Sequence, residues 1–110
     1  MSQLPGAATA IVNDRKITKY LLDSTNPNGG AGKAKFFGSF GFTRANWADF
    51  KKALLDHPRR NSVTKQERTH YGGDKYVVSC SLATPDGRNP CVVSVWIIEP
   101  PDPSPRFVTA

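Results

Sequence analysis

The sequence has few cysteines, few histidines and no long hydrophobic run. Its 110 residues include two cysteines and two histidines. No apolar run approaches the roughly 20 residues that a membrane-spanning helix requires. The first residues also lack the basic start and apolar core of a secretory signal. We therefore expect a single domain, residues 1–110, that is cytoplasmic and contacts no membrane.

Sequence signatures of the common enzyme sites are also missing. There is no nucleophile-elbow motif, Walker loop, zinc-protease helix motif or paired Cys-x-x-Cys. A glycine-rich stretch at residues 29–33 lacks the spacing and the following hydroxyl residue of a phosphate loop. The nine acidic residues are scattered singly, which argues against a carboxylate-held magnesium ion. We expect neither a metal nor another cofactor.

The two cysteines flank an expected turn at Pro85 and Asp86. A symmetric turn would place Cys80 opposite Cys91, whereas a bulge at Gly87 would shift the register by one and turn the two side chains to opposite faces. The spacing favours two small, buried apolar residues over zinc ligands. A disulfide is the alternative.

Positive charge is concentrated in the first two-thirds of the chain. The formal net charge is +6, and residues 1–75 hold 13 Lys and Arg against 6 Asp and Glu. Residues 76–110 hold 2 against 3. A basic face indicates an anionic partner such as nucleic acid, although many basic proteins bind none.

Apolar residues at helical spacing predict three helices before the last third of the chain. The expected ranges are residues 14–22, 31–40 and 44–56. Asn13 or Asp14 is suited to capping the first helix, and Thr43 to capping the third. We expect the third helix to end before His57 and Pro58, because proline disfavours helical geometry at the residue before it.

The remaining sequence predicts an antiparallel sheet. Residues 61–69 read as an edge strand with Lys65 and Arg68 protecting the edge. Alternating apolar residues predict strands at 75–82, 90–98 and Arg106–Thr109, and the third of these four strands is apolar on both faces and so should be central. The expected fold is α+β, with N-terminal helices packed on a C-terminal meander of about four strands.

Histidines, lysines, arginines and hydroxyls are the side chains left for chemistry, and they suit a metal-independent ribonuclease. Cleavage by the 2′-OH of RNA needs a base, an acid and positive charge at the phosphate. His70 is the better acid or base because it follows an edge strand, although a surface turn would also explain it. His57 lies at a helix end, where a charged imidazole would stabilise the helix dipole.

The ordered motifs resemble one bacterial family. They are Lys16-x-x-x-Tyr20-Leu21-Leu22, Lys33-Ala34-Lys35-Phe36-Phe37, Gly41-Phe42-Thr43, Tyr71-Gly72, Thr84-Pro85-Asp86-Gly87-Arg88, Val95-Trp96-Ile97-Ile98 and Pro105-Arg106-Phe107-Val108-Thr109-Ala110. This pattern is similar to the bacterial domain of unknown function 6883. Members occur alone beside a small antitoxin or as the last domain of polymorphic toxins, and they resemble the barnase–EndoU–colicin–RelE ribonucleases. The resemblance implies a toxin-like endoribonuclease with RNA as substrate and an antitoxin or immunity protein as partner.

The resemblance also implies site residues. The polar positions that match the motifs are Lys33, Lys35, Arg88, Arg106 and Thr109. We expect His70 to act as acid or base, Lys33 and Arg106 to stabilise phosphate charge, and Thr109 to orient it. Lys35, Arg88 and Arg68 would contact the substrate.

The sequence departs from the family pattern at one position. Gly32 stands where the family usually has histidine. This departure leaves open a second hypothesis, in which the domain is a non-catalytic binding or inhibitor module that uses its basic face.

Overall fold

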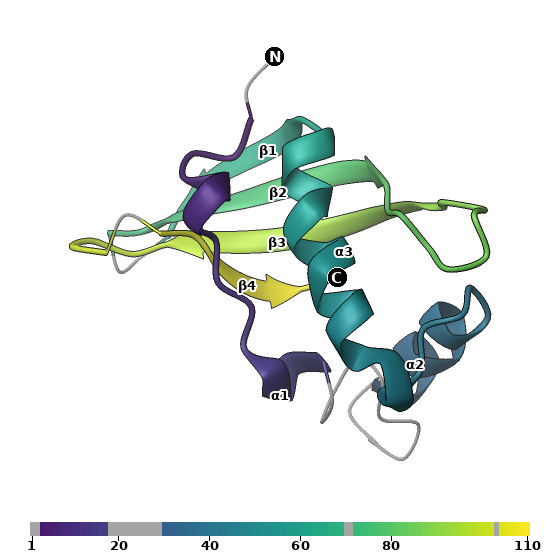
Figure 1. Ribbon diagram of the computed structural model, residues 1–110. Helices are drawn as coiled ribbons and strands as arrows, with labels where there is room; N and C mark the ends of the chain where they lie inside the picture. The colour runs from purple at the N-terminus through teal and green to yellow at the C-terminus, as the bar shows by residue number, and fades with distance from the viewer. Residues whose placement is uncertain (1–2, 18–29, 70–71, 103) are drawn as a thin grey trace.

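Helices precede a four-stranded antiparallel sheet, which confirms the expected α+β fold. The structure is a computed structural model and describes residues 3–17, 30–69, 72–102 and 104–110. The elements are α1 (Asp14–Lys16), α2 (Gly30–Gly38), α3 (Trp47–Arg60), β1 (Val63–Arg68), β2 (Asp74–Ser81), β3 (Cys91–Ile98) and β4 (Arg106–Thr109). The strand order is β1-β2-β3-β4 (Figure 1). The expected first helix extended to residue 22, and residues 18–22 lie outside the described residues.

Helix α3 lies across one face of the sheet and covers the core (Figure 1). Phe50 and Leu54 on its inner side are fully buried, as is Trp96 on β3. Phe50 stacks on Phe42 with ring centroids 4.5 Å apart, and Trp96 meets Phe107 of β4 edge-to-face at 5.3 Å. One aromatic contact thus lies among the helices and the other joins the last two strands.

Helix α3 continues past the expected end. It runs to Arg60 and contains Pro58, although proline cannot donate the usual backbone hydrogen bond. After the proline, the helix is ended by Asn61, whose backbone N–H and side-chain amide both donate to the His57 carbonyl, at 3.2 and 2.9 Å. The helix also begins later than expected, after a 3₁₀ turn at Arg44–Asn46 that follows Thr43.

The sheet has one covered face and one open face. Val92, Ser94 and Trp96 of β3 are buried, whereas Val93 on the opposite face is 47% exposed. Strand β3 lies between β2 and β4, which confirms its expected internal position. Its outward side is nonetheless exposed at Cys91 and Val93, so the apolar residues on that face do not mark a second covering layer.

Strand β4 is shorter than the strand it joins. It pairs only with Val95–Ile97, in the second half of β3. The first residues of β3, beginning at Cys91, therefore extend beyond the end of β4. Strand β1 is the other edge, as expected, and Lys65 on it forms an ion pair with Glu67 at 2.6 Å.

The described helices are all too short or too polar to cross a membrane.

Candidate functional site

A cleft of about 280 Å³ lies between α2 and the start of β3. Helix α2 contributes Gly32, Lys33, Phe36 and Phe37, and β3 contributes Cys91, Val92 and Val93. Ala110 closes the end where β4 stops. We call this the α2–β3 cleft. Its walls are mainly apolar, and Phe36 is 43% exposed on one side of it.

Two expected site residues, 76 positions apart in sequence, meet beside this cleft. The ammonium group of Lys33, on the first turns of α2, donates to the hydroxyl oxygen of Thr109 at 2.8 Å. The contact is partly buried. Strand pairing fixes Thr109 opposite Val95, so the hydroxyl is held by the sheet while the lysine comes from the helix.

Arg106 does not share this cleft. It begins β4 opposite Ile97, forms an ion pair with Glu99, and lines a separate cavity of about 190 Å³. Ile11, Asp102 and Ser104 line the same cavity. The structure therefore places Lys33 and Arg106 at two sites along β4 rather than around one phosphate. Glu99 and Asp102 were not among the expected site residues, because each is a single acidic residue in a proline-rich stretch.

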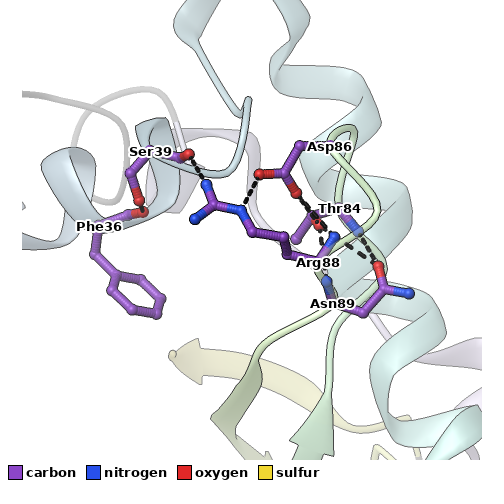
Figure 2. A network of polar contacts seen from close by, with 6 residues as sticks. All are labelled: Phe36, Ser39, Thr84, Asp86, Arg88 and Asn89. Atoms are coloured by element: carbon purple, nitrogen blue, oxygen red, sulfur yellow. Dashed lines mark hydrogen bonds and ion pairs between the residues drawn. The ribbon is translucent and has the colours of Figure 1, made fainter.

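Arg88 holds the loop between β2 and β3 against the end of α2 (Figure 2). Its guanidinium donates to the Asp86 carboxylate at 2.5 Å and to the Ser39 backbone carbonyl. The same group lies 4.4 Å above the Phe40 ring. The backbone N–H and then the side chain of Arg88, together with Thr84, lower the pKa of the Asp86 carboxyl. We expected Arg88 to contact the substrate, but these contacts give it a structural role.

Two other expected site residues are not among those that line the cleft. Lys35 on α2 and Arg68 at the end of β1 are exposed, and Arg68 lies opposite Asp74 in the sheet. His70 lies outside the described residues. Its described neighbours Thr69 and Gly73 close a turn, with the Thr69 N–H donating to the Gly73 carbonyl at 2.8 Å.

His57 is buried, which the sequence did not indicate. Its Nε2 lies 2.8 Å from the Cys80 carbonyl, and because a carbonyl only accepts, Nε2 carries the proton. Nδ1 then accepts from the Ser94 hydroxyl at 2.8 Å, and the Trp96 indole N–H donates to the same oxygen at 2.8 Å. Burial lowers the pKa of His57. The expectation of a charged histidine acting on the helix dipole was wrong, because this imidazole is neutral and inside the core.

The expectation of buried cysteines was also wrong. Cys80 and Cys91 are both exposed and unlinked. The strands adopt the shifted register, with Cys80 opposite Val92. Regular alternation would then bury Cys80 beside Val92, yet both cysteines are exposed. Within the described part of the chain, no three His, Cys, Asp or Glu side chains gather as metal ligands would.

A family model described as domain of unknown function (DUF6883) matches residues 3–110, which is nearly the whole chain. The chain belongs to the DUF6883 family. No curated protein and no solved structure matched it.

Two of the motifs quoted above line the α2–β3 cleft of this DUF6883 domain, the first through Lys33, Phe36 and Phe37 and the last through Ala110. Lys33 and Thr109 come from two separate motifs, and Arg88 from a third braces the end of α2. The cleft joins a cation and a hydroxyl to an apolar wall. This combination suits an anion that carries a flat, apolar group.

Proposed function

We propose that this DUF6883 domain is a toxin-like, metal-independent endoribonuclease that holds an RNA phosphate at Lys33 and Thr109. The observation that carries the proposal is the 2.8 Å contact between these two side chains at an otherwise apolar cleft. A lysine ammonium supplies charge to a phosphate, and a neighbouring hydroxyl orients its oxygens. The net charge of +6 supports attraction of a polyanion.

The apolar wall of the cleft suits a nucleobase. Phe36 and Val93 are 43% and 47% exposed, and Phe36 is also held edge-to-face against Phe37 and Phe40. Bases of single-stranded RNA stack on aromatic rings without regard to sequence. We therefore assign the phosphate to Lys33 and the adjoining base to Phe36.

Cleavage needs an acid and a base in addition to the phosphate site. In the proposed step a base removes the 2′-OH proton, the 2′ oxygen attacks phosphorus, and the bond to the 5′ oxygen breaks as an acid protonates it. The products are a 2′,3′-cyclic phosphate and a 5′-hydroxyl. We assign acid or base work to His70. Arg106, about 10 Å along the strand from Thr109 by the rise of a β-strand, would bind a neighbouring phosphate.

The test is cleavage of total RNA in EDTA by the purified protein. Lys33→Ala should lower the rate at least about tenfold, and Thr109→Val by a smaller factor, because charge stabilisation is lost in the first and orientation in the second. Lys52→Ala is the matched control, since Lys52 is an exposed lysine that lines a different groove. Equal cleavage by Lys33→Ala and wild type would disprove the phosphate site. If wild type cleaves no RNA, the proposed ribonuclease activity is disproved.

A second candidate is a non-catalytic module that binds RNA or an antitoxin-like protein at the same cleft. It is favoured by one observation: among the described residues that line the cleft, Cys91 is the only one besides Lys33 with a titratable side chain, and its pKa is raised. This candidate predicts tight single-stranded RNA binding without cleavage. Growth arrest on expression of wild type but not of His70→Ala would instead support the enzyme.

A further inference from the structure

Cys80 and Cys91 lie at neighbouring positions of adjacent strands. Cys80 near the end of β2 is opposite Val92, and Ser81 is opposite Cys91 at the start of β3. The two cysteines are thus one diagonal step apart. With strands about 4.8 Å apart and a rise of about 3.3 Å per residue, their Cα atoms are about 6 Å apart. This separation lies within the range that a disulfide spans.

The backbone at Cys80 departs from regular strand geometry. In a regular strand Cys80 would lie on the same face as Tyr76, Val78 and Leu82. All three are buried, so a regular strand would bury Cys80 as well. Cys80 is instead exposed and has a φ of 153°. Its carbonyl accepts a hydrogen bond from the His57 Nε2–H at 2.8 Å. The buried histidine therefore fixes the rotated peptide that brings the Cys80 thiol out of the core.

The two side chains are near enough to influence each other. A hydrogen bond between the Cys80 and Cys91 side chains raises the pKa of Cys91. Both side chains are also open to solvent. A dithiol of this kind is accessible to small reagents, whereas a buried cysteine is inert.

We propose that Cys80 and Cys91 form an exposed vicinal dithiol that is oxidised to an intramolecular disulfide by low-molecular-weight disulfides. One thiolate attacks a sulfur of the small disulfide, RSSR, and releases one RSH to leave a protein–SR mixed disulfide. The second cysteine then attacks the protein sulfur, forms the Cys80–Cys91 bond and releases the second RSH. The protein loses two electrons and two protons, and RSSR is reduced to two RSH.

The site adjoins the α2–β3 cleft but does not depend on the function proposed for it. Cys91 lines the cleft, whereas Cys80 does not. A disulfide here would join the ends of β2 and β3 and change the wall opposite Phe36. Reversible oxidation is thus a modification of the cleft itself, whatever ligand the cleft holds.

The experiment treats fully reduced full-length protein with glutathione disulfide at pH about 8 and measures intact mass and free thiols. Wild type should go from two free thiols to none, with a mass loss of two hydrogens and no lasting glutathione adduct. Peptide mapping should link Cys80 to Cys91, and dithiothreitol should restore both thiols.

Cys80→Ser and Cys91→Ser are the matched controls. Each should retain one glutathione, because no second thiol can release it. The proposal is overturned if wild type keeps stable glutathione adducts, keeps both thiols free, or forms disulfide-linked dimers. Because the decisive measurement is made on wild type, a folding defect in either variant would not rescue the proposal.

Discussion

At the scale of single residues, the buried His57 links one helix to two strands. It joins α3 to β2 through the Cys80 carbonyl and to β3 through Ser94. In the neutral state both ring nitrogens have partners, because Nε2 donates to the carbonyl and Nδ1 accepts from the serine. Protonation would reverse the hydrogen bond to Ser94, whose hydroxyl oxygen would become the acceptor, and would place a charge inside the core.

The lowered pKa of His57 predicts that stability falls in mildly acidic solution. The unfolded chain binds a proton near pH 6.5, but the folded chain does so only at lower pH. The contribution of His57 to the free energy of unfolding is then fully present above about pH 6.5 and decreases as the pH falls toward the pKa of the folded state. Urea unfolding of a His70→Gln background between about pH 7.5 and pH 5 measures this without the second histidine.

Adding His57→Gln to that background should abolish the slope in this pH window. Carboxylates with lowered pKa values, such as Glu67 and Asp86, titrate below the window. An unchanged slope in the double variant would show that another group is responsible.

Ser94 predicts a second effect at this scale. Its buried hydroxyl donates to His57 and accepts from Trp96, so Ser94→Ala leaves two buried polar groups without partners. We expect a loss of about 1–3 kcal/mol in the free energy of unfolding. Ser79→Ala is the control, because Ser79 makes its hydroxyl contact with Thr64 at an exposed position and should cost less than about 0.5 kcal/mol. Similar losses in both variants would contradict the assignment.

At the scale of elements, the loop between β2 and β3 docks closely on the end of α2. Gly41 has a φ of 103°, and a Cβ added there would lie 2.9 Å from the Pro85 side chain. Gly41→Ala should therefore destabilise the fold by about 1–3 kcal/mol, from both backbone strain and the clash. Thermal unfolding measures the change.

Gly38→Ala is the matched control for this substitution. Gly38 ends α2, and an added Cβ meets nothing within 4 Å. Alanine there should leave stability unchanged or raise it by up to about 1 kcal/mol, since it lowers the entropy of the unfolded chain. Equal losses at both glycines would argue against a tight contact with Pro85.

The sequence predicted the order and type of the elements because apolar side chains repeat at helical or strand spacing. It could not predict the end of α3, which continues through Pro58 to Arg60 although the proline lacks a backbone donor. The prediction that Cys80 is buried was also wrong. Alternation along β2 predicts a buried side chain there, but a histidine 23 residues earlier sets the local backbone.

The candidate site was predictable only in part. The family motifs named Lys33 and Thr109, and the structure places them in contact. The same motifs also named Arg106 and Arg88, which lie with Glu99 and Asp86 instead. The spacing of residues in the sequence does not show where the four-residue strand β4 pairs with β3. It therefore could not show that Arg106 and Arg88 lie apart from Lys33 and Thr109.

At the scale of the whole molecule, the uneven charge predicts salt-dependent binding of single-stranded RNA. Affinity should fall linearly on a log–log plot against salt concentration, because bound phosphates release counterions. Lys33→Ala should make that slope shallower by about one unit, as expected for one lost phosphate contact. Fluorescence anisotropy over a salt series measures it.

The control for this prediction is again Lys52→Ala, whose slope should match that of wild type within error if binding is confined to the α2–β3 cleft. Equal changes in the two variants would indicate diffuse attraction over the basic surface rather than a phosphate site.

The contact between Trp96 and Ser94 also gives the molecule an optical property. The Trp96 indole is fully buried and shares a hydroxyl with His57, so its emission should be blue-shifted in the folded state and quenched when the imidazole takes up a proton. Trp47 is only partly buried, and Trp47→Phe would leave one fluorophore. The folded protein then reports the protonation of its own core histidine by light emission, with no attached dye.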